Sequence, residues 1–192
     1  MHDVRLPLLA ALLSGSLLAA AQASPVATPA SAPQAATSAW SNLKHGFTLE
    51  LMQLSPDNVR AFYDNMGYPP RAIAAIAQVC VFGTSIHNRS KAPITYDVTA
   101  WRAVTPDGQQ HPLITKTQWL ARWKPTGVSS DWSILPPQQT LQPGDWAQGF
   151  TTVALPRGTR FKLVYSWREH GTQHQATLVG PQCAAASGHG QP

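Results

Sequence analysis

The 192-residue sequence is poor in charge and in cysteine, and it carries no recognisable catalytic motif. Charged residues make up 12% of the chain, and 14 lysines and arginines against 9 acidic residues leave a net charge of +5. The basic residues are scattered singly, so the chain has no basic run that would follow a phosphate backbone. We therefore expect a solvated, mildly basic surface and no nucleic-acid partner.

Signatures of common enzymes are missing as well. The G-x-S-x-G nucleophile turn, the glycine-rich phosphate loop and the H-E-x-x-H zinc helix are absent from the sequence. Asp57 and Asp64 lie seven residues apart, but Asp57 is better explained as a carboxylate in the first turn of a helix. We expect no enzymatic activity and no bound cofactor. Because catalytic carboxylates need not be close in sequence, an uncharacterised enzyme stays an alternative.

Long apolar runs are absent except at the N-terminus. There Arg5 precedes an apolar run over residues 6–21, and the small residues of Ala21-Gln22-Ala23 follow it. The run is shorter than the ~20 apolar residues of a membrane span, and its flanks are typical of a secretory signal. We predict a signal peptide over residues 1–23 with cleavage near Ala23. The mature protein is then periplasmic or secreted and has no membrane span.

The segment after the predicted cleavage point has neither charge nor large apolar side chains. Residues 24–39 are mostly proline, alanine, serine and threonine, so they cannot bury enough surface to offset their ordering entropy. We predict a flexible linker there, one domain over residues 40–183 and a disordered tail over residues 184–192. The domain is long enough for a single hydrophobic core.

The two cysteines, Cys80 and Cys183, are expected to form a disulfide in an oxidising compartment. A bridge of this span closes a loop of about 100 residues. Chain-entropy estimates for such a loop give a stabilisation of the folded state by ~4–5 kcal/mol. The alternative is that Cys80 acts as a nucleophile. That role requires a neighbouring base, which the sequence does not identify.

Apolar residues alternate with period two through most of the predicted domain, which indicates strands. The clearest pair lies between Ala77 and Val104, where two alternating runs flank the polar turn of residues 87–93. This turn includes Asn88-Arg89-Ser90, which fits a glycosylation sequon and indicates an exposed position. About eight short strands with proline and glycine turns predict a mostly β fold, an antiparallel, immunoglobulin-like β-sandwich.

Three short helices are expected between the strands. Ser55-Pro56-Asp57 is typical of a helix start, and a second helix over residues 70–77 completes a small helical hairpin. Residues 116–123, KTQWLARW, predict one further short helix that ends before Pro125. We expect the hairpin to close one end of the sheet.

The sequence of the last two predicted strands indicates how they pair. If His170-Gly171 forms a two-residue turn, Trp167 pairs with His174 and Leu163 pairs with Leu178. The apolar faces of the two strands then coincide, whereas a slip by one residue would place them on opposite sides of the sheet.

Histidines are the main candidates for metal ligands. His170 and His174 form an H-x3-H pair, but a hairpin does not bring such a pair together as a helix does, so they are weak candidates. We expect no metal site. The alternative is a periplasmic copper carrier with dispersed ligands, which would come from His45, His87, His111, Met52 and Met66.

Seven tryptophans are many for this length, and several must lie in the core. Trp101 falls on the strand face opposite Tyr96. Trp119 and Trp123 lie four residues apart on one side of the predicted helix. We take Trp101, Trp119 and Trp123 as the candidate binding face, exposed to an apolar or glycan partner. The alternative is that this helix packs on the edge of the sandwich.

The order of these motifs resembles the immunoglobulin-like accessory domains of exported bacterial proteins. The resemblance covers residues 79–179 and rests on a strand ending in HN, a strand near a PDG turn, the turn LQPGDW and the segment ALPRGTRFKLVY. It implies a binding or assembly module and assigns no functional residue. We therefore expect a periplasmic, non-enzymatic interaction module that binds a protein or a glycan.

Overall fold

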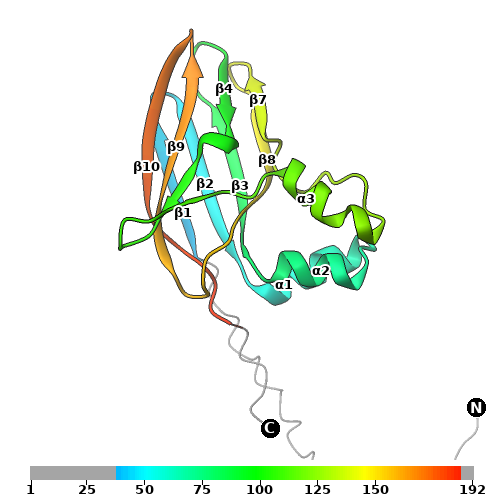
Figure 1. Ribbon diagram of the computed structural model, residues 1–192. Helices are drawn as coiled ribbons and strands as arrows, with labels where there is room; N and C mark the ends of the chain where they lie inside the picture. Colours follow the sequence, from blue (N-terminus) through cyan, green and yellow to red (C-terminus); the bar gives the residue numbers. More distant parts are fainter. Residues whose placement is uncertain (1–37, 187–192) are drawn as a thin grey trace, which may run out of the picture. The chain divides into compact units, whose positions relative to one another are not determined.

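The computed structural model describes residues 38–186 (Figure 1). The predicted signal peptide, the linker up to residue 37 and the tail from residue 187 lie outside the described residues. The strands are β1 (Ala39–Lys44), β2 (Phe47–Leu54), β3 (Cys80–Asn88), β4 (Ile94–Asp97), β5 (Arg102–Val104), β6 (Gln110–Pro112), β7 (Gln138–Leu141), β8 (Trp146–Val153), β9 (Arg160–Glu169) and β10 (Thr172–Gln182). The helices are α1 (Pro56–Asn65), α2 (Pro70–Ala77) and α3 (Lys116–Trp123), with short 3-10 turns η1 (Val98–Ala100) and η2 (Lys124–Thr126).

Two antiparallel sheets pack against each other, which confirms the predicted β-sandwich with a helical hairpin and one further helix (Figure 1). The four-stranded sheet has the order β1-β2-β3-β8. In the six-stranded sheet, β9 pairs with β10, β4 and β5. β7 pairs with β4, and β6 pairs with β5. The strand before β2 was not predicted, because its sequence AWSNLK has no clean alternation.

The register predicted for the last hairpin is confirmed. Trp167 pairs with His174 and Leu163 pairs with Leu178. His170 and Gly171 both have positive φ, at 49° and 78°, which is the backbone of a type I′ hairpin turn. The β1–β2 hairpin uses the same pair of residue types, His45 and Gly46, with φ of 46° and 73°.

The main core lies between the two sheets. Inward side chains of β2 and β9 meet there, and the ring of Phe47 stacks on Trp167 with centroids 4.6 Å apart. The Tyr165 ring packs beside both, because inward positions on a strand recur every second residue. This alternation leaves the intervening side chains of each sheet on the outside.

The predicted disulfide between Cys80 and Cys183 is present, with Cα atoms 5.2 Å apart. It joins the first residue of β3 to the residue that follows β10, and so it links the two sheets. Both cysteines are buried in the main core. An intramolecular disulfide of this kind indicates an oxidising compartment.

The three helices build a second apolar core against the four-stranded sheet, beside β3 and β8 (Figure 1). The Ser55 hydroxyl accepts a hydrogen bond from the Asn58 amide and starts α1, as its sequence predicts. Thr115 and Gln118 form a capping box at the start of α3. The buried members of this second core are Val59, Tyr63, Ala72, Ile73, Ile76, Ala77, Val81, Ile114, Trp119, Trp123 and Ile134.

Candidate interaction surface

The predicted binding face of three tryptophans is wrong, because all three side chains are buried. Trp101 lies in the main core, and its indole N–H donates to the Ser166 carbonyl at 3.1 Å. Trp119 and Trp123 lie in the second core and stack on each other with centroids 5.0 Å apart. The helix therefore packs on the sandwich, which was the alternative interpretation.

Each buried indole N–H in the second core also has a partner. Trp119 donates to the Thr152 hydroxyl at 2.8 Å, and Trp123 donates to the Ala72 carbonyl at 3.2 Å. Buried indoles normally pair their N–H in this way, because an unpaired buried donor is costly. These contacts fasten α3 to β8 and to α2.

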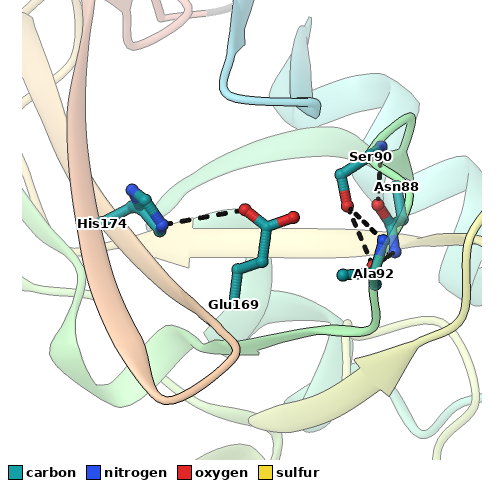
Figure 2. A network of polar contacts seen from close by, with 5 residues as sticks. All are labelled: Asn88, Ser90, Ala92, Glu169 and His174. Carbon is teal, nitrogen blue, oxygen red and sulfur yellow. Dashed lines mark hydrogen bonds and ion pairs between the residues drawn. The ribbon is translucent and has the colours of Figure 1, made fainter.

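Within residues 38–186, no group of three or more His, Cys, Asp or Glu side chains comes together in a way that could hold a metal ion. His170 lies at the tip of the β9–β10 turn, whereas His174 stacks on Trp167 and has its Nε2 atom 3.8 Å from Glu169 Oε2 (Figure 2). The His45 ring is His174's other neighbour, with centroids 5.1 Å apart. The two residues of the H-x3-H pair thus lie in different surroundings, as the register predicts.

Asn88 of the sequon is buried, although an exposed turn was expected. Its side-chain amide donates to the carbonyls of Ala92 and Leu141, at 2.8 and 2.9 Å. Ser90 bonds to both Asn88 and Ala92, which closes the loop between β3 and β4 (Figure 2). The Asn88 amide is therefore occupied in the fold and is not presented to solvent.

The outer side of the four-stranded sheet is where exposed apolar side chains gather. The register gives three cross-strand rows of outward positions, which we call the open face: Leu43, Thr48, His87 and Trp146; Ser41, Glu50, Ser85 and Gln148; Ala39, Met52, Gly83 and Phe150. The next row, Leu54, Val81 and Thr152, contacts the helices. The helices thus cover one end of this sheet side and leave the other end open.

Exposure on the open face is high for large apolar side chains. Trp146 and Leu43 are each 57% exposed, and Met52 is 46% exposed. The Trp146 ring stacks on the neighbouring His87 ring, with planes only 19° apart. Leu43 and Trp146 stand at the two ends of the first row, and Met52 lies in the third row. A sheet side with several exposed large apolar side chains is a candidate interaction surface.

Trp132 extends this surface toward the helices. Its side chain is 73% exposed and contacts Phe62 of α1, with ring centroids 6.0 Å apart. Phe62 in turn packs on Phe150 of the open face at 4.8 Å. The three rings connect the loop before β7 to the last row of the open face.

The base of the Trp132 loop is held by a buried polar network. The Asp131 carboxylate accepts hydrogen bonds from the Ser133 hydroxyl at 2.8 Å and from the Tyr68 hydroxyl at 2.6 Å. It also accepts from the Ile134 amide at 2.7 Å. The Tyr63 hydroxyl lies 2.8 Å from the Ser133 oxygen, and because Ser133 donates to Asp131, Tyr63 is the donor to Ser133.

Both tyrosines act as proton donors in this network. Burial is the main cause that raises the pKa of Tyr63 and of Tyr68 well above its ordinary value. Neither hydroxyl therefore serves as a base at neutral pH. The network orients Trp132 and does not resemble a nucleophile activated by a base.

The open face carries little charge. Glu50 is the one carboxylate among its positions, and none of them is a lysine or an arginine. Its other polar groups are hydroxyls, the Gln148 amide and the His87 ring. This contrasts with the outer side of β9, which carries Arg160, Lys162 and Arg168.

Trp132 and Trp146 are the residues that sequence reasoning missed. Both were counted among the seven tryptophans but not selected as a site. The alternation of β8 places Trp146 on the same side as the polar Gln148, and this pairing was the available signal for exposure. No protein-family model matches this chain, and no curated protein matches it at a significant level.

Proposed function

We propose that this protein is an exported, non-enzymatic interaction module that binds a protein partner on the open face and on Trp132. The observation that carries the proposal is the grouping of four exposed large apolar side chains on one side of the domain. These are Leu43, Met52, Trp132 and Trp146.

The composition of this surface supports a protein partner. Protein interfaces are enriched in aromatic residues and methionine at their centre, and they are depleted in lysine and glutamate. The open face together with Trp132 follows this pattern, with two tryptophans and a methionine and with Glu50 as the sole charged side chain. Tryptophans are also the residues that most often dominate binding energy.

The rigidity of the surface supports the same proposal. Trp146 projects from a sheet, and Trp132 projects from a loop that the Asp131 network holds. Side chains that are already ordered lose less conformational entropy on binding. Secretion agrees with the disulfide, which indicates an oxidising compartment. No helix within residues 38–186 is long and apolar enough to cross a membrane.

The experiment is a capture assay with the mature protein and the periplasmic extract of its own organism. Wild type is compared with the double variant Trp132→Ala/Trp146→Ala and with Val179→Ala as a control. Val179 is 65% exposed but lies on the six-stranded sheet. We expect the double variant to lose a defined partner protein that the control retains, with all three melting temperatures nearly equal.

Two outcomes contradict the proposal. One is a partner that the double variant captures as strongly as wild type. The other is capture of a polysaccharide and of no protein, which would support a glycan-binding surface instead. Because exposed side chains give up little burial, loss of folding is not expected to confuse the comparison.

A further inference from the structure

Strand β8 is an edge of the four-stranded sheet, and part of this edge is already paired. The chain at Ser133–Leu135 runs beside it in parallel, and the Phe150 amide donates to the Ser133 carbonyl at 2.6 Å. The Leu135 amide donates back to the Phe150 carbonyl at 2.9 Å. The Ile114 amide then bonds to the Thr152 carbonyl at 2.8 Å. The edge thus accepts short extended segments along its second half.

The first half of this edge remains open. The backbone N–H and C=O groups of successive residues in a strand point in opposite directions. Every second residue counted back from Phe150 and Thr152 therefore turns these groups away from β3. Those residues in the first half are Trp146 and Gln148, and both side chains are exposed. Their amides and carbonyls bond to no other backbone group within residues 38–186. They offer two donors and two acceptors in the geometry of a strand.

The other sheet edges have protective features that the first half of β8 lacks. Asn42 of β1 donates to the Thr177 carbonyl of β10 at 3.1 Å, and Gln53 donates to the Gln182 carbonyl at 2.8 Å. β6 is three residues long and ends in Pro112, and β7 is four residues long and follows Pro136-Pro137. Short strands, prolines and covering side chains are the usual protections of an edge.

We propose that the partner contributes a short extended segment that adds as a strand to the open half of β8, beside Trp146 and Gln148. This rests on the proposed function and specifies how the partner binds. Strand addition takes its affinity from main-chain hydrogen bonds and its specificity from alternate side chains. The edge carries no charge between Trp146 and Gly149, so the segment is uncharged, with an apolar side chain that packs on the Trp146 ring.

The test uses a displayed library of random linear peptides, selected on the mature protein and then resynthesised. Three variants separate main-chain from side-chain recognition. Gln148→Pro removes the outward amide, and because this amide takes no part in the β3 ladder, the sheet is kept. Gln148→Ala removes the side chain and keeps the amide. Gln175→Pro is the matched control, because Gln175 lies two residues before Thr177 and so its amide also points outward, on another edge strand, β10.

We expect the selected peptides to bind Gln148→Pro at least ~10-fold more weakly than wild type, and to bind Gln148→Ala and Gln175→Pro nearly as wild type does. In the wild-type protein, the peptide should also slow hydrogen exchange at the Trp146 and Gln148 amides by ~10-fold or more. This second measurement decides the matter if Gln148→Pro does not fold.

Other results overturn the inference in distinguishable ways. If Trp146→Ala weakens binding while Gln148→Pro does not, the open face is the site and strand addition is wrong. If neither variant has an effect, the proposed function fails as well. A library that yields no peptide with protection at Trp146 and Gln148 also overturns strand addition.

Discussion

The Asp131 carboxylate accepts a 2.6 Å hydrogen bond from the Tyr68 hydroxyl, and this pair fixes the base of the loop that carries Trp132. Replacing Asp131 with asparagine halves the acceptors and adds donors that face other donors. We expect a loss of about 1–3 kcal/mol in unfolding free energy, because a buried group left unsatisfied pays its desolvation cost. Chemical denaturation measures the loss, and faster hydrogen exchange at Ile134 locates it.

Asp64 provides the control for that substitution. It lies exposed on α1, so Asp64→Asn should change stability by less than ~0.5 kcal/mol. Equal effects of the two substitutions would argue that the Asp131 network contributes nothing particular to the loop.

The tryptophans divide into two classes that a stability measurement separates. Trp123→Ala removes a fully buried ring and should cost ~3–5 kcal/mol, because it leaves a cavity in the second core. Trp146→Ala should cost less than ~0.5 kcal/mol, because that ring is mostly exposed. Thermal melts of the two variants decide the assignment, and a reversed order would contradict it.

Gly149 is needed because the chain crosses close to it. A Cβ atom at this position would lie 2.7 Å from the Leu135 amide nitrogen and 2.9 Å from the Ser133 carbonyl oxygen. Both are backbone atoms that already pair with Phe150, so Gly149→Ala should cost about 1–3 kcal/mol through overpacking. The control is Gly83→Ala, where the added Cβ meets the flexible end of Met52 at 3.3 Å. Urea unfolding should show little change there.

Stability should fall at alkaline pH. Burial raises the pKa of Tyr96 to about 12, whereas an unfolded tyrosine titrates near 10. The folded state therefore holds the phenol proton more tightly than the unfolded chain does. This contribution is complete below pH ~10 and is lost as the pH rises from about 10 to 12. Denaturation midpoints measured across this range should drop, and Tyr96→Phe should reduce the slope.

Much of the fold could be predicted because local signals were strong. The helix Pro70–Ala77 begins with proline, and KTQWLARW ends before one, so the bounds of α2 and α3 were predicted as observed. The β9–β10 register followed from two alternating runs joined by His-Gly. The disulfide followed from a chain that has two cysteines and a predicted export signal.

The candidate surface could not be predicted in the same way. The spacing of Trp119 and Trp123 shows that they share a helix side, but it does not show what packs against that side. For Trp146, the alternation shows which sheet side it occupies. Only the tertiary arrangement shows that the helices cover the end of that side near Thr152 and stop short of Trp146.

The Cys80–Cys183 bond also sets how the domain would respond to tension. A force that pulls on both ends of the domain passes from Cys183 directly to Cys80 through the sulfur atoms. The chain between them, which contains β8, α3 and the Trp132 loop, carries no load. Stretching can therefore extend β1, β2 and the helical hairpin and separate β2 from β3, while β3 and the strand that bears Trp146 both lie within the bridged loop and stay paired.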